Sequence, residues 1–233
     1  MANPPLVRLV LWDVDHTLME TGGVGRKVFA DAFANATGRP MGAMAEVSGR
    51  TEPDIFRETA ELHGVPITTE LFDTFATQLA EGYQDQIEEM RKRGRALPGA
   101  AAALAALAKD TTIVQSVLTG NIRPVAETKL TAFGLDEHVD FEAGAYGSDD
   151  AVRPHLVRIA QQRAAARYGT TFDSTNTILI GDTPSDVTTA RQGGARIVAV
   201  ASGSSTPAEL RFAGAEVALT DLSNLDGLIA ALA

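Results

Sequence analysis

Hydrophobic positions follow two different spacings along this chain. An apolar run broken only by Arg8 predicts a strand over residues 7–13. From about residue 20 to residue 95, apolar side chains instead recur every three or four positions, as one face of a helix requires. Two such faces are Val24, Val28, Ala32, Phe33 and Ala36, and then Leu71, Phe75, Leu79, Tyr83 and Ile87. Segments 38–40 and 64–66 each contain a glycine and a proline, and are expected to separate the helices.

Beyond residue 97 the pattern changes to short apolar runs that alternate with helical segments. Strands are expected over 112–118, 177–180, 196–200 and 216–219, with a weaker one over 139–143. Helices are expected over 100–108, 124–133, 155–168 and 185–192. Strands that alternate with helices form a parallel sheet with right-handed crossovers, so the fold class is α/β.

The two patterns divide the chain into a core and an insert. We expect residues 1–19 and 96–233 to form the α/β core, and residues 20–95 to form an α-helical cap inserted directly after the first strand. The glycine-rich segment 22–25 would permit a hinge motion between the two.

Composition narrows the class of protein. The 233 residues include 20 Lys and Arg against 30 Asp and Glu, a formal net charge of −10, which argues against a nucleic-acid or anionic-membrane binder. Cysteine is absent, which excludes disulfides, thiolate zinc sites and cysteine nucleophiles. Residues 1–5 lack a leader pattern, and the apolar run that follows is too short to span a membrane. These features favour a soluble cytoplasmic protein.

Polar residues gather where the predicted strands end. Asp13 and Asp15 follow the first strand, Thr119 follows the second, and Asp182 with Asp186 follows the third. Ligands of such sheets bind beyond the carboxyl ends of the strands. Two carboxylates two residues apart repel each other unless they share a cation, and one Mg²⁺ would remove that cost. It would also make Asp13 a nucleophile toward phosphorus. An all-oxygen acidic set favours Mg²⁺ over zinc.

Each of these features also has a purely structural interpretation. Aspartate is common in turns, so Asp13 and Asp15 fit an acidic turn. Acids are favoured at a helix N-terminus, which would explain Asp182 and Asp186. Thr119 fits a capping turn ahead of a proline at position 124.

The ordered set of motifs resembles the haloacid dehalogenase-like hydrolase superfamily over nearly the whole chain. The motifs are Asp-x-Asp-x-Thr at 13–17, Thr-Gly-Asn at 119–121 and Gly-Asp-x-x-x-Asp at 181–186. Within the superfamily, the chain is similar to the phosphoglycolate-phosphatase branch with a helical cap. This resemblance implies a Rossmann-like core and a requirement for Mg²⁺.

The resemblance also implies a role for each motif residue. Asp13 would be the nucleophile that forms an aspartyl-phosphate, because covalent catalysis divides one difficult displacement into two. Asp15 would first protonate the leaving alcohol and then activate water, while its backbone carbonyl binds the metal. Asp182 would be a further metal ligand, and Asp186 would either bind the metal or hold a metal-bound water. Thr119, with the backbone N–H groups of Gly120 and Asn121, would bind the phosphoryl oxygens.

The family further needs a cation that bridges nucleophile and phosphate, usually a lysine before a proline. Here that position is Arg153, followed by Pro154, and Arg153 is the first candidate. Lys129, on the helix after Thr119, is the alternative, because its stem can pass along an apolar helix face. Either residue is equally compatible with a solvated surface position.

Substrate selection is expected in the cap. The segment 48–52 is the expected contact loop, where Arg50 would bind a substrate carboxylate or hydroxyl groups. A simple turn into the helix that begins near residue 53 explains the same residues.

The acid at position 15 narrows the reaction. Relatives that cleave halides or phosphonates lack it, so the resemblance favours hydrolysis of a small phosphate ester such as phosphoglycolate. A β-phosphoglucomutase-like mutase and a non-catalytic binding module are the alternatives. We expect a monomer or homodimer whose partner is a small-molecule phosphate ester, with no nucleic acid or membrane partner.

Overall fold

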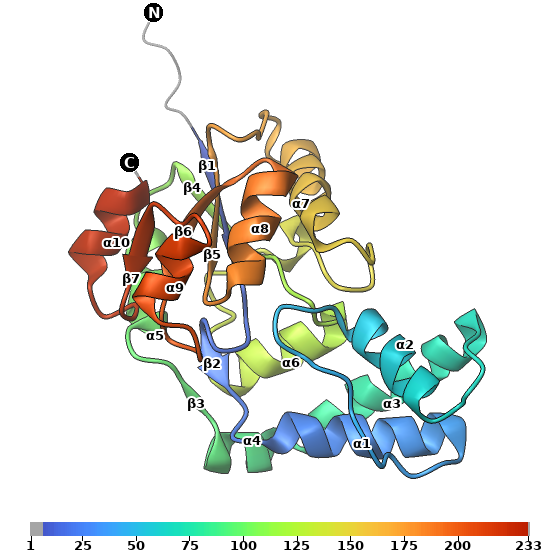
Figure 1. The fold of residues 1–233 in the computed structure, drawn as a ribbon. Helices are drawn as coiled ribbons and strands as arrows, with labels where there is room; N and C mark the ends of the chain where they lie inside the picture. The colour runs from blue at the N-terminus through green and yellow to red at the C-terminus, as the bar shows by residue number, and fades with distance from the viewer. Residues whose placement is uncertain (1–6, 233) are drawn as a thin grey trace, which may run out of the picture.

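The computed structural model describes residues 7–232 and shows a sheet-based core with a group of helices at one end (Figure 1). The expectations for residues 1–6, namely the start of the core and the absence of a leader, lie outside the described residues.

Five parallel strands form the core sheet, in the spatial order β4-β1-β5-β6-β7. They are β1 (Arg8–Trp12), β4 (Ile113–Val117), β5 (Thr177–Gly181), β6 (Arg196–Val200) and β7 (Val217–Leu219). The predictions of an α/β class and of these five strands are confirmed, to within one residue at either end of each strand. β1 lies between β4 and β5, so the ends of these three strands are neighbours.

Helices cover both faces of the sheet (Figure 1). They are α5 (Ala100–Leu107), α6 (Arg123–Ala132), α7 (Arg153–Tyr168), α8 (Pro184–Gly193), α9 (Pro207–Phe212) and α10 (Leu225–Leu232). Leu9 and Leu11 of β1 contact the apolar cluster that includes α7 and α8, whereas Val10 and Trp12 contact the cluster of α5, α6 and α10. Because successive side chains point to opposite faces, a strand buried on both faces is an uninterrupted apolar run.

The cap has its own hydrophobic core. Its helices are α1 (Val24–Thr37), α2 (Glu52–Leu62), α3 (Thr69–Asp85) and α4 (Ile87–Arg93). Aromatic rings fill its centre: Phe75 lies 4.3 Å from Phe56 and 4.9 Å from Phe29, measured between ring centroids. The antiparallel ribbon of β2 (Met19–Glu20) and β3 (Arg95–Ala96) lies where the sequence places the two junctions between core and cap.

Helix α6 belongs to both hydrophobic cores. Ala126 and Leu130 pack into the sheet cluster, while Ile122, Val125 and Ala132 pack into the cap cluster. Figure 1 shows α6 lying between the sheet and the cap helices. This helix therefore fixes where the cap docks.

The weaker predicted strand over 139–143 is wrong. The segment forms the 3-10 helix η1 (Phe141–Ala143) instead. Its flanks still contact β4: the backbone N–H of Asp140 donates to the carbonyl of Gln115 at 2.9 Å, and an isolated bridge joins Ala145 to Leu118. The side chain of Asp140 accepts a hydrogen bond from the backbone N–H of Glu142 and thereby favours a turn over an extended strand. Segment 20–95 is also not helical throughout, because residues 38–51 form no helix.

The backbone at Gly99, the residue before α5, closely approaches the backbone at Leu222. Its φ is +82°, and a Cβ there would lie 2.2 Å from the carbonyl oxygen of Leu222. Gly38 has a similar φ of +68° with nothing within 4 Å of an added Cβ. We predict that Gly99→Ala lowers the free energy of unfolding in urea by about 3 kcal/mol, and Gly38→Ala by about 1 kcal/mol. Equal losses would contradict the close approach of Leu222.

Candidate active site

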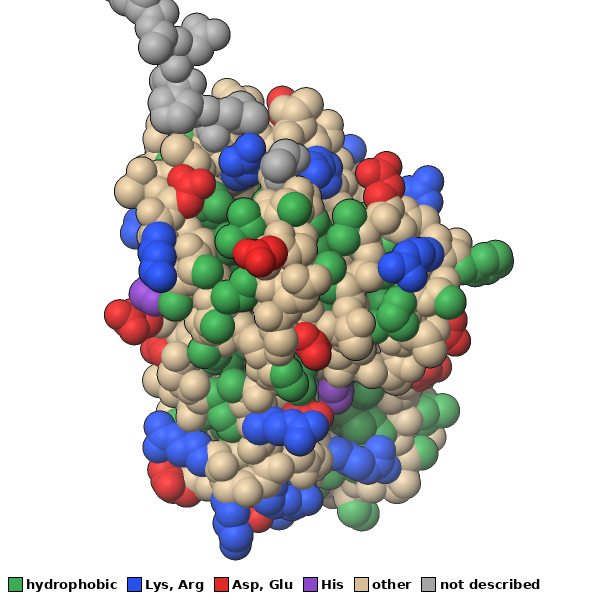
Figure 2. Space-filling model, turned by 90° about the vertical axis from the view of Figure 1, so that its left-hand side faces the viewer, with side chains coloured by type: hydrophobic (Ala, Val, Ile, Leu, Met, Phe, Trp, Pro, Cys, Tyr) green, Lys and Arg blue, Asp and Glu red, His purple; other side chains and the backbone are tan. Residues whose placement is uncertain are grey.

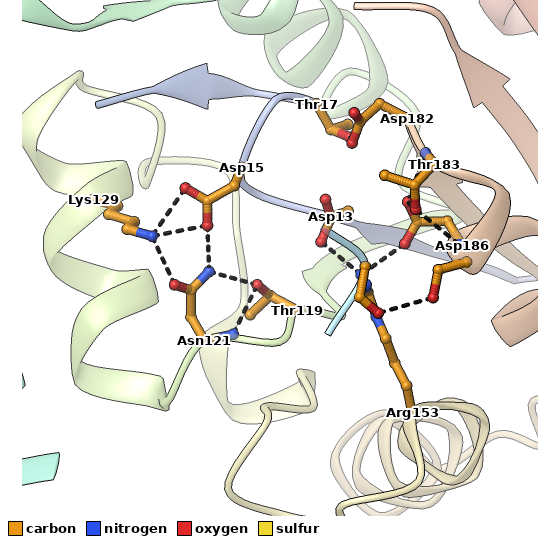
Figure 3. Close-up of polar contacts among 12 residues, drawn as sticks. Asp13, Asp15, Thr17, Thr119, Asn121, Lys129, Arg153, Asp182, Thr183 and Asp186 are labelled. Carbon is orange, nitrogen blue, oxygen red and sulfur yellow. Dashed lines mark hydrogen bonds and ion pairs between the residues drawn. The ribbon is translucent and has the colours of Figure 1, made fainter. Parts of the chain in front are cut away.

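Three adjacent strand ends carry the site. Asp13 directly follows β1, Thr119 lies two residues beyond β4, and Asp182 directly follows β5. The backbone N–H of Asp13 donates to the carbonyl of Ile180 at 2.9 Å, so the pairing of β1 with β5 extends to Asp13 and fixes its backbone. Figure 3 shows these side chains converging from separate parts of the chain.

Asp13, Asp182 and Asp186 form a buried acidic cluster. Their carboxylate oxygens lie within 4.8 Å of one another. Burial, together with the negative charge of Asp186, raises the pKa of Asp13 well above its usual range and that of Asp182 to about 7. Such a cluster is stable only with cations nearby.

Arg153, the first residue of α7, supplies one cation. Its Nη2 donates to Asp13 Oδ1 at 2.9 Å and to Asp186 Oδ1 at 2.6 Å. The guanidinium is 8% exposed, and its buried Nε has no partner among the described residues. The structure therefore brings Arg153 to Asp13, where a bridging cation is expected, with donor capacity to spare.

Asp186 has two roles in the structure. At the third position of α8 its Oδ2 accepts from the backbone N–H and the hydroxyl of Thr183, which completes a capping box. Asp186 is therefore both a helix-capping residue and a member of the acidic cluster. One of its oxygens caps α8, and the other contacts Arg153.

Asp15 points away from that cluster, toward Lys129 (Figure 3). Lys129 Nζ donates to both Asp15 oxygens at 2.9 and 2.8 Å, and Asn121 Nδ2 donates to Asp15 Oδ2 at 2.7 Å. Burial alone would raise the pKa of Asp15, but the ammonium and these hydrogen bonds hold it below the usual value. Lys129 thus contacts the second acid, and no hydrogen bond joins it to Asp13.

Thr119 is oriented by Asn121. Thr119 Oγ1 accepts from the side-chain amide of Asn121 at 2.7 Å and from its backbone N–H at 3.2 Å. With both acceptor positions used, the hydroxyl proton faces any ligand placed beside it. Gly120, in the same turn, accepts at its carbonyl from the backbone N–H of Glu52 at 2.7 Å.

The residues present fit Mg²⁺. With all three carboxylates ionised, the Asp13 cluster and its one guanidinium carry a net charge of −2, the charge that one divalent cation balances. The donors are hard carboxylate oxygens, and no cysteine or histidine belongs to the cluster.

Two residues that the sequence analysis did not single out shape this cluster. Thr17 is fully buried and donates to Asp182 Oδ1 at 3.2 Å. Gly203, in the loop after β6, passes so close that an added Cβ would lie 1.8 Å from Asp182 Oδ2. Thr17 belongs to the Asp-x-Asp-x-Thr motif and was therefore detectable, whereas nothing in the local sequence marks Gly203.

The cap loop lies directly on the site. An added Cβ on Gly120 would meet the carbonyl oxygen of Arg50 at 2.0 Å, and Ser185 Oγ donates to the Gly49 carbonyl at 2.8 Å. The Arg50 side chain itself pairs with Asp54 and Glu58 on the cap. Its expected contact with substrate stays a prediction.

Glu52 ends the segment 48–52 that the sequence analysis expects as the contact loop, but its contact with the core was not predicted. It begins α2, is 8% exposed, and its Oε2 accepts from the backbone N–H of Ile122 at 2.7 Å. The cap thereby satisfies an open donor at the start of α6. Burial raises the pKa of Glu52 to about 7, although Lys129 opposes the shift.

Comparisons with known proteins show the family to which the chain belongs. The family model of haloacid dehalogenase-like hydrolases matches residues 10–191. A curated protein of Dickeya dadantii named "Probable phosphatase IndB" is 24% identical over 225 residues, or 96% of this chain and 94% of that protein. The chain therefore belongs to the haloacid dehalogenase-like hydrolase family, and the predicted family and enzyme class are confirmed.

Solved structures share the whole fold. A hydrolase from Pseudomonas syringae has a TM-score of 0.67 and 22% identity, with 97% of this chain and 99% of that chain covered. A structure from Haemophilus somnus 129pt, described as a "predicted phosphoglycolate phosphatase", has a TM-score of 0.66 and 16% identity over 97% of this chain and 100% of that chain. Separately, none of the helices within residues 7–232 has the length and hydropathy to cross a membrane.

Glu52→Gln tests the burial of this cap carboxylate. Between its ordinary pKa of 4.5 and the raised value of about 7, the folded protein binds more protons than the unfolded chain, so the wild type loses stability as pH rises through this window. Glutamine keeps an acceptor for Ile122 and removes the charge. We predict equal stability of wild type and variant near pH 4.5, and a variant more stable by about 2 kcal/mol at pH 8.

Urea unfolding at several pH values measures the difference. Glu216→Gln, at an exposed position, is the matched control and should follow the wild type at every pH. A pH-independent difference for Glu52→Gln would show that the buried carboxylate does not titrate as described.

Proposed function

We propose that this protein is a Mg²⁺-dependent phosphatase that hydrolyses a small phosphomonoester through an aspartyl-phosphate on Asp13. The observation that carries the proposal is the contact of Arg153 with Asp13 inside a buried acidic cluster. A nucleophile, a cation for phosphoryl oxygens and the donors for a divalent metal are then within one small volume. Membership of a hydrolase family and the phosphatase relative support the same activity.

The first half-reaction uses the free oxygen of Asp13. Oδ1 is engaged by Arg153, so Oδ2 attacks phosphorus, and the new O–P bond replaces the ester bond. The spare guanidinium donors of Arg153 and the hydroxyl of Thr119 are placed to stabilise the phosphoryl oxygens. Asp15, in its protonated form, delivers a proton to the leaving oxygen, and it recovers a proton from water in the second half-reaction.

The second half-reaction regenerates the enzyme. Water attacks the phosphorus of the aspartyl-phosphate, Asp15 accepts its proton, and inorganic phosphate leaves. Asp13, Asp182, Asp186 and the backbone carbonyl of Asp15 would hold Mg²⁺. When bound, the ion would offset the repulsion between carboxylate and phosphate.

A small substrate fits the position of the cap loop. Gly49 lies against Ser185 and Thr183, and the Arg50 carbonyl lies against Gly120, so the cap loop covers the core next to the acids. Phosphoglycolate is the first ester to test. Arg50, held by Asp54 and Glu58, would be released from them to bind the substrate carboxylate.

Hydrolysis of p-nitrophenyl phosphate with Mg²⁺ tests the proposal. We predict that Asp13→Asn lowers turnover by at least about 1,000-fold, because the amide cannot form the phosphoenzyme. Chelation of the metal should abolish activity and added Mg²⁺ should restore it. Asp31→Asn, at an exposed cap position, is the control.

Full activity of Asp13→Asn, or activity without metal, would refute the proposal. A sugar-bisphosphate intermediate with hexose phosphates would indicate a mutase instead.

Replacement of Arg153 tests its contact with phosphate. Lysine keeps the charge but loses the planar fork, so we predict that Arg153→Lys lowers kcat/KM by about 10–100-fold and Arg153→Met by about 1,000-fold. Arg158→Met, at an exposed position on the same helix, should match the wild type in the same assay. Equal activity of Arg153→Met and wild type would assign the bridging role to another cation.

A further inference from the structure

Lys129 is a buried cation with every donor in use. It is 4% exposed, and its ammonium donates to both oxygens of Asp15 and to Asn121 Oδ1, the last at 2.7 Å. A lysine has three N–H donors, so these contacts fix the ammonium in one place. A flexible side chain immobilised in this way also immobilises the carboxylate that it holds.

The contacts of Asp15 continue to the phosphate-binding turn. The amide of Asn121 donates to both Asp15 and Thr119, each at 2.7 Å, while its oxygen accepts from Lys129. Lys129, Asn121 and Thr119 therefore hold Asp15 in a fixed position relative to the expected phosphoryl group (Figure 3).

The cap completes the surroundings of Lys129. The ring of Tyr83, on cap helix α3, lies 4.9 Å from the ammonium, close enough for a cation–π interaction. One residue further, Gln84 donates to Thr128 at 2.5 Å. Lys129 lies on α6, the helix that packs into both hydrophobic cores, so its position depends on the cap being docked.

We infer that Lys129 is a positioning residue that, with Tyr83 of the cap, orients the Asp15 carboxylate to activate water for hydrolysis of the phosphoenzyme. The inference rests on the proposed function. If Lys129 has this role, hydrolysis of the phosphoenzyme is the step that depends on the docking of the cap. When the cap is displaced, Tyr83 leaves the ammonium, and the hold on Asp15 weakens.

Pre-steady-state kinetics with p-nitrophenyl phosphate test this inference. Nitrophenolate leaves without a proton, so formation of the phosphoenzyme does not need Asp15, whereas hydrolysis does. We predict that Lys129→Met lowers kcat by about 100-fold, the scale of a positioned general base, and changes kcat/KM by less than about 3-fold. A burst of about one nitrophenolate per enzyme should precede the slow steady state, and acid quenching should trap the phosphoenzyme.

Matched variants separate positioning from structural damage. Lys27→Met, at an exposed position on the cap, should give wild-type kinetics. Tyr83→Leu should show the same split between kcat and kcat/KM, and more strongly than Tyr83→Phe, which keeps the aromatic face. If Lys129→Met does not fold, as judged by circular dichroism, Tyr83→Leu and Tyr83→Phe test the inference instead. A fall in kcat without an equal fall in kcat/KM is again the expected result.

The outcomes are distinguishable. An equal fall of kcat and kcat/KM without a burst, or unchanged kinetics, would overturn the inference for Lys129 while leaving the phosphatase intact. A wild-type protein that releases no nitrophenolate would instead refute the proposed function.

Discussion

Buried negative charge at the end of β1 is the constraint on which the rest of the site depends. Asp13 and Asp15 are separated by one residue, and Asp182 and Asp186 approach from the next strand and helix. Burial raises the energy of each ionised carboxylate, and removal of one partner from a buried pair leaves an uncompensated charge that costs about 3–5 kcal/mol. Two cations compensate this negative charge. Arg153 pairs with Asp13 and Asp186, and Lys129 pairs with Asp15. The cluster of Asp13, Asp182 and Asp186 therefore has more negative than positive charges, whereas the charge of Asp15 is balanced by that of Lys129.

The different net charges around Asp13 and around Asp15 suit different chemical roles. The cluster around Asp13 retains excess negative charge and hard oxygen donors, which suits a divalent metal and an incoming phosphoryl group. The group around Asp15 is neutral and hydrogen-bonded at every oxygen, which suits a proton carrier that must keep its orientation. The two carboxylates of one short motif therefore acquire different environments, because helices α7 and α6, on opposite faces of the sheet, each direct one cation toward the same strand end.

The sequence predicts those parts of the structure that depend on local spacing. The apolar run before Asp13 indicated a strand. Arg153 was identified through the family resemblance, from its place before a proline. The contact of Lys129 with Asp15 joins residues 114 positions apart, and that of Glu52 with Ile122 joins residues 70 apart. Periodicity carries no information about such contacts, so Lys129 was predicted as an alternative partner of the phosphate. The false strand over 139–143 has a related cause, because a short apolar stretch does not determine its own conformation when a nearby aspartate caps a turn.

Helix α6 explains how a separate cap influences chemistry in the core. One of its faces packs on the sheet and another on the cap aromatics, so it is apolar on two sides and its polar residues are confined to the remaining positions. Lys129 occupies the boundary between these faces, where its ammonium reaches Asp15 on one side and Tyr83 on the other. At the N-terminus of the same helix, Glu52 of the cap accepts the N–H of Ile122, adjacent to Asn121. Cap docking therefore contacts both ends of the segment that carries Thr119, Asn121 and Lys129, the residues that surround the proposed proton carrier, Asp15.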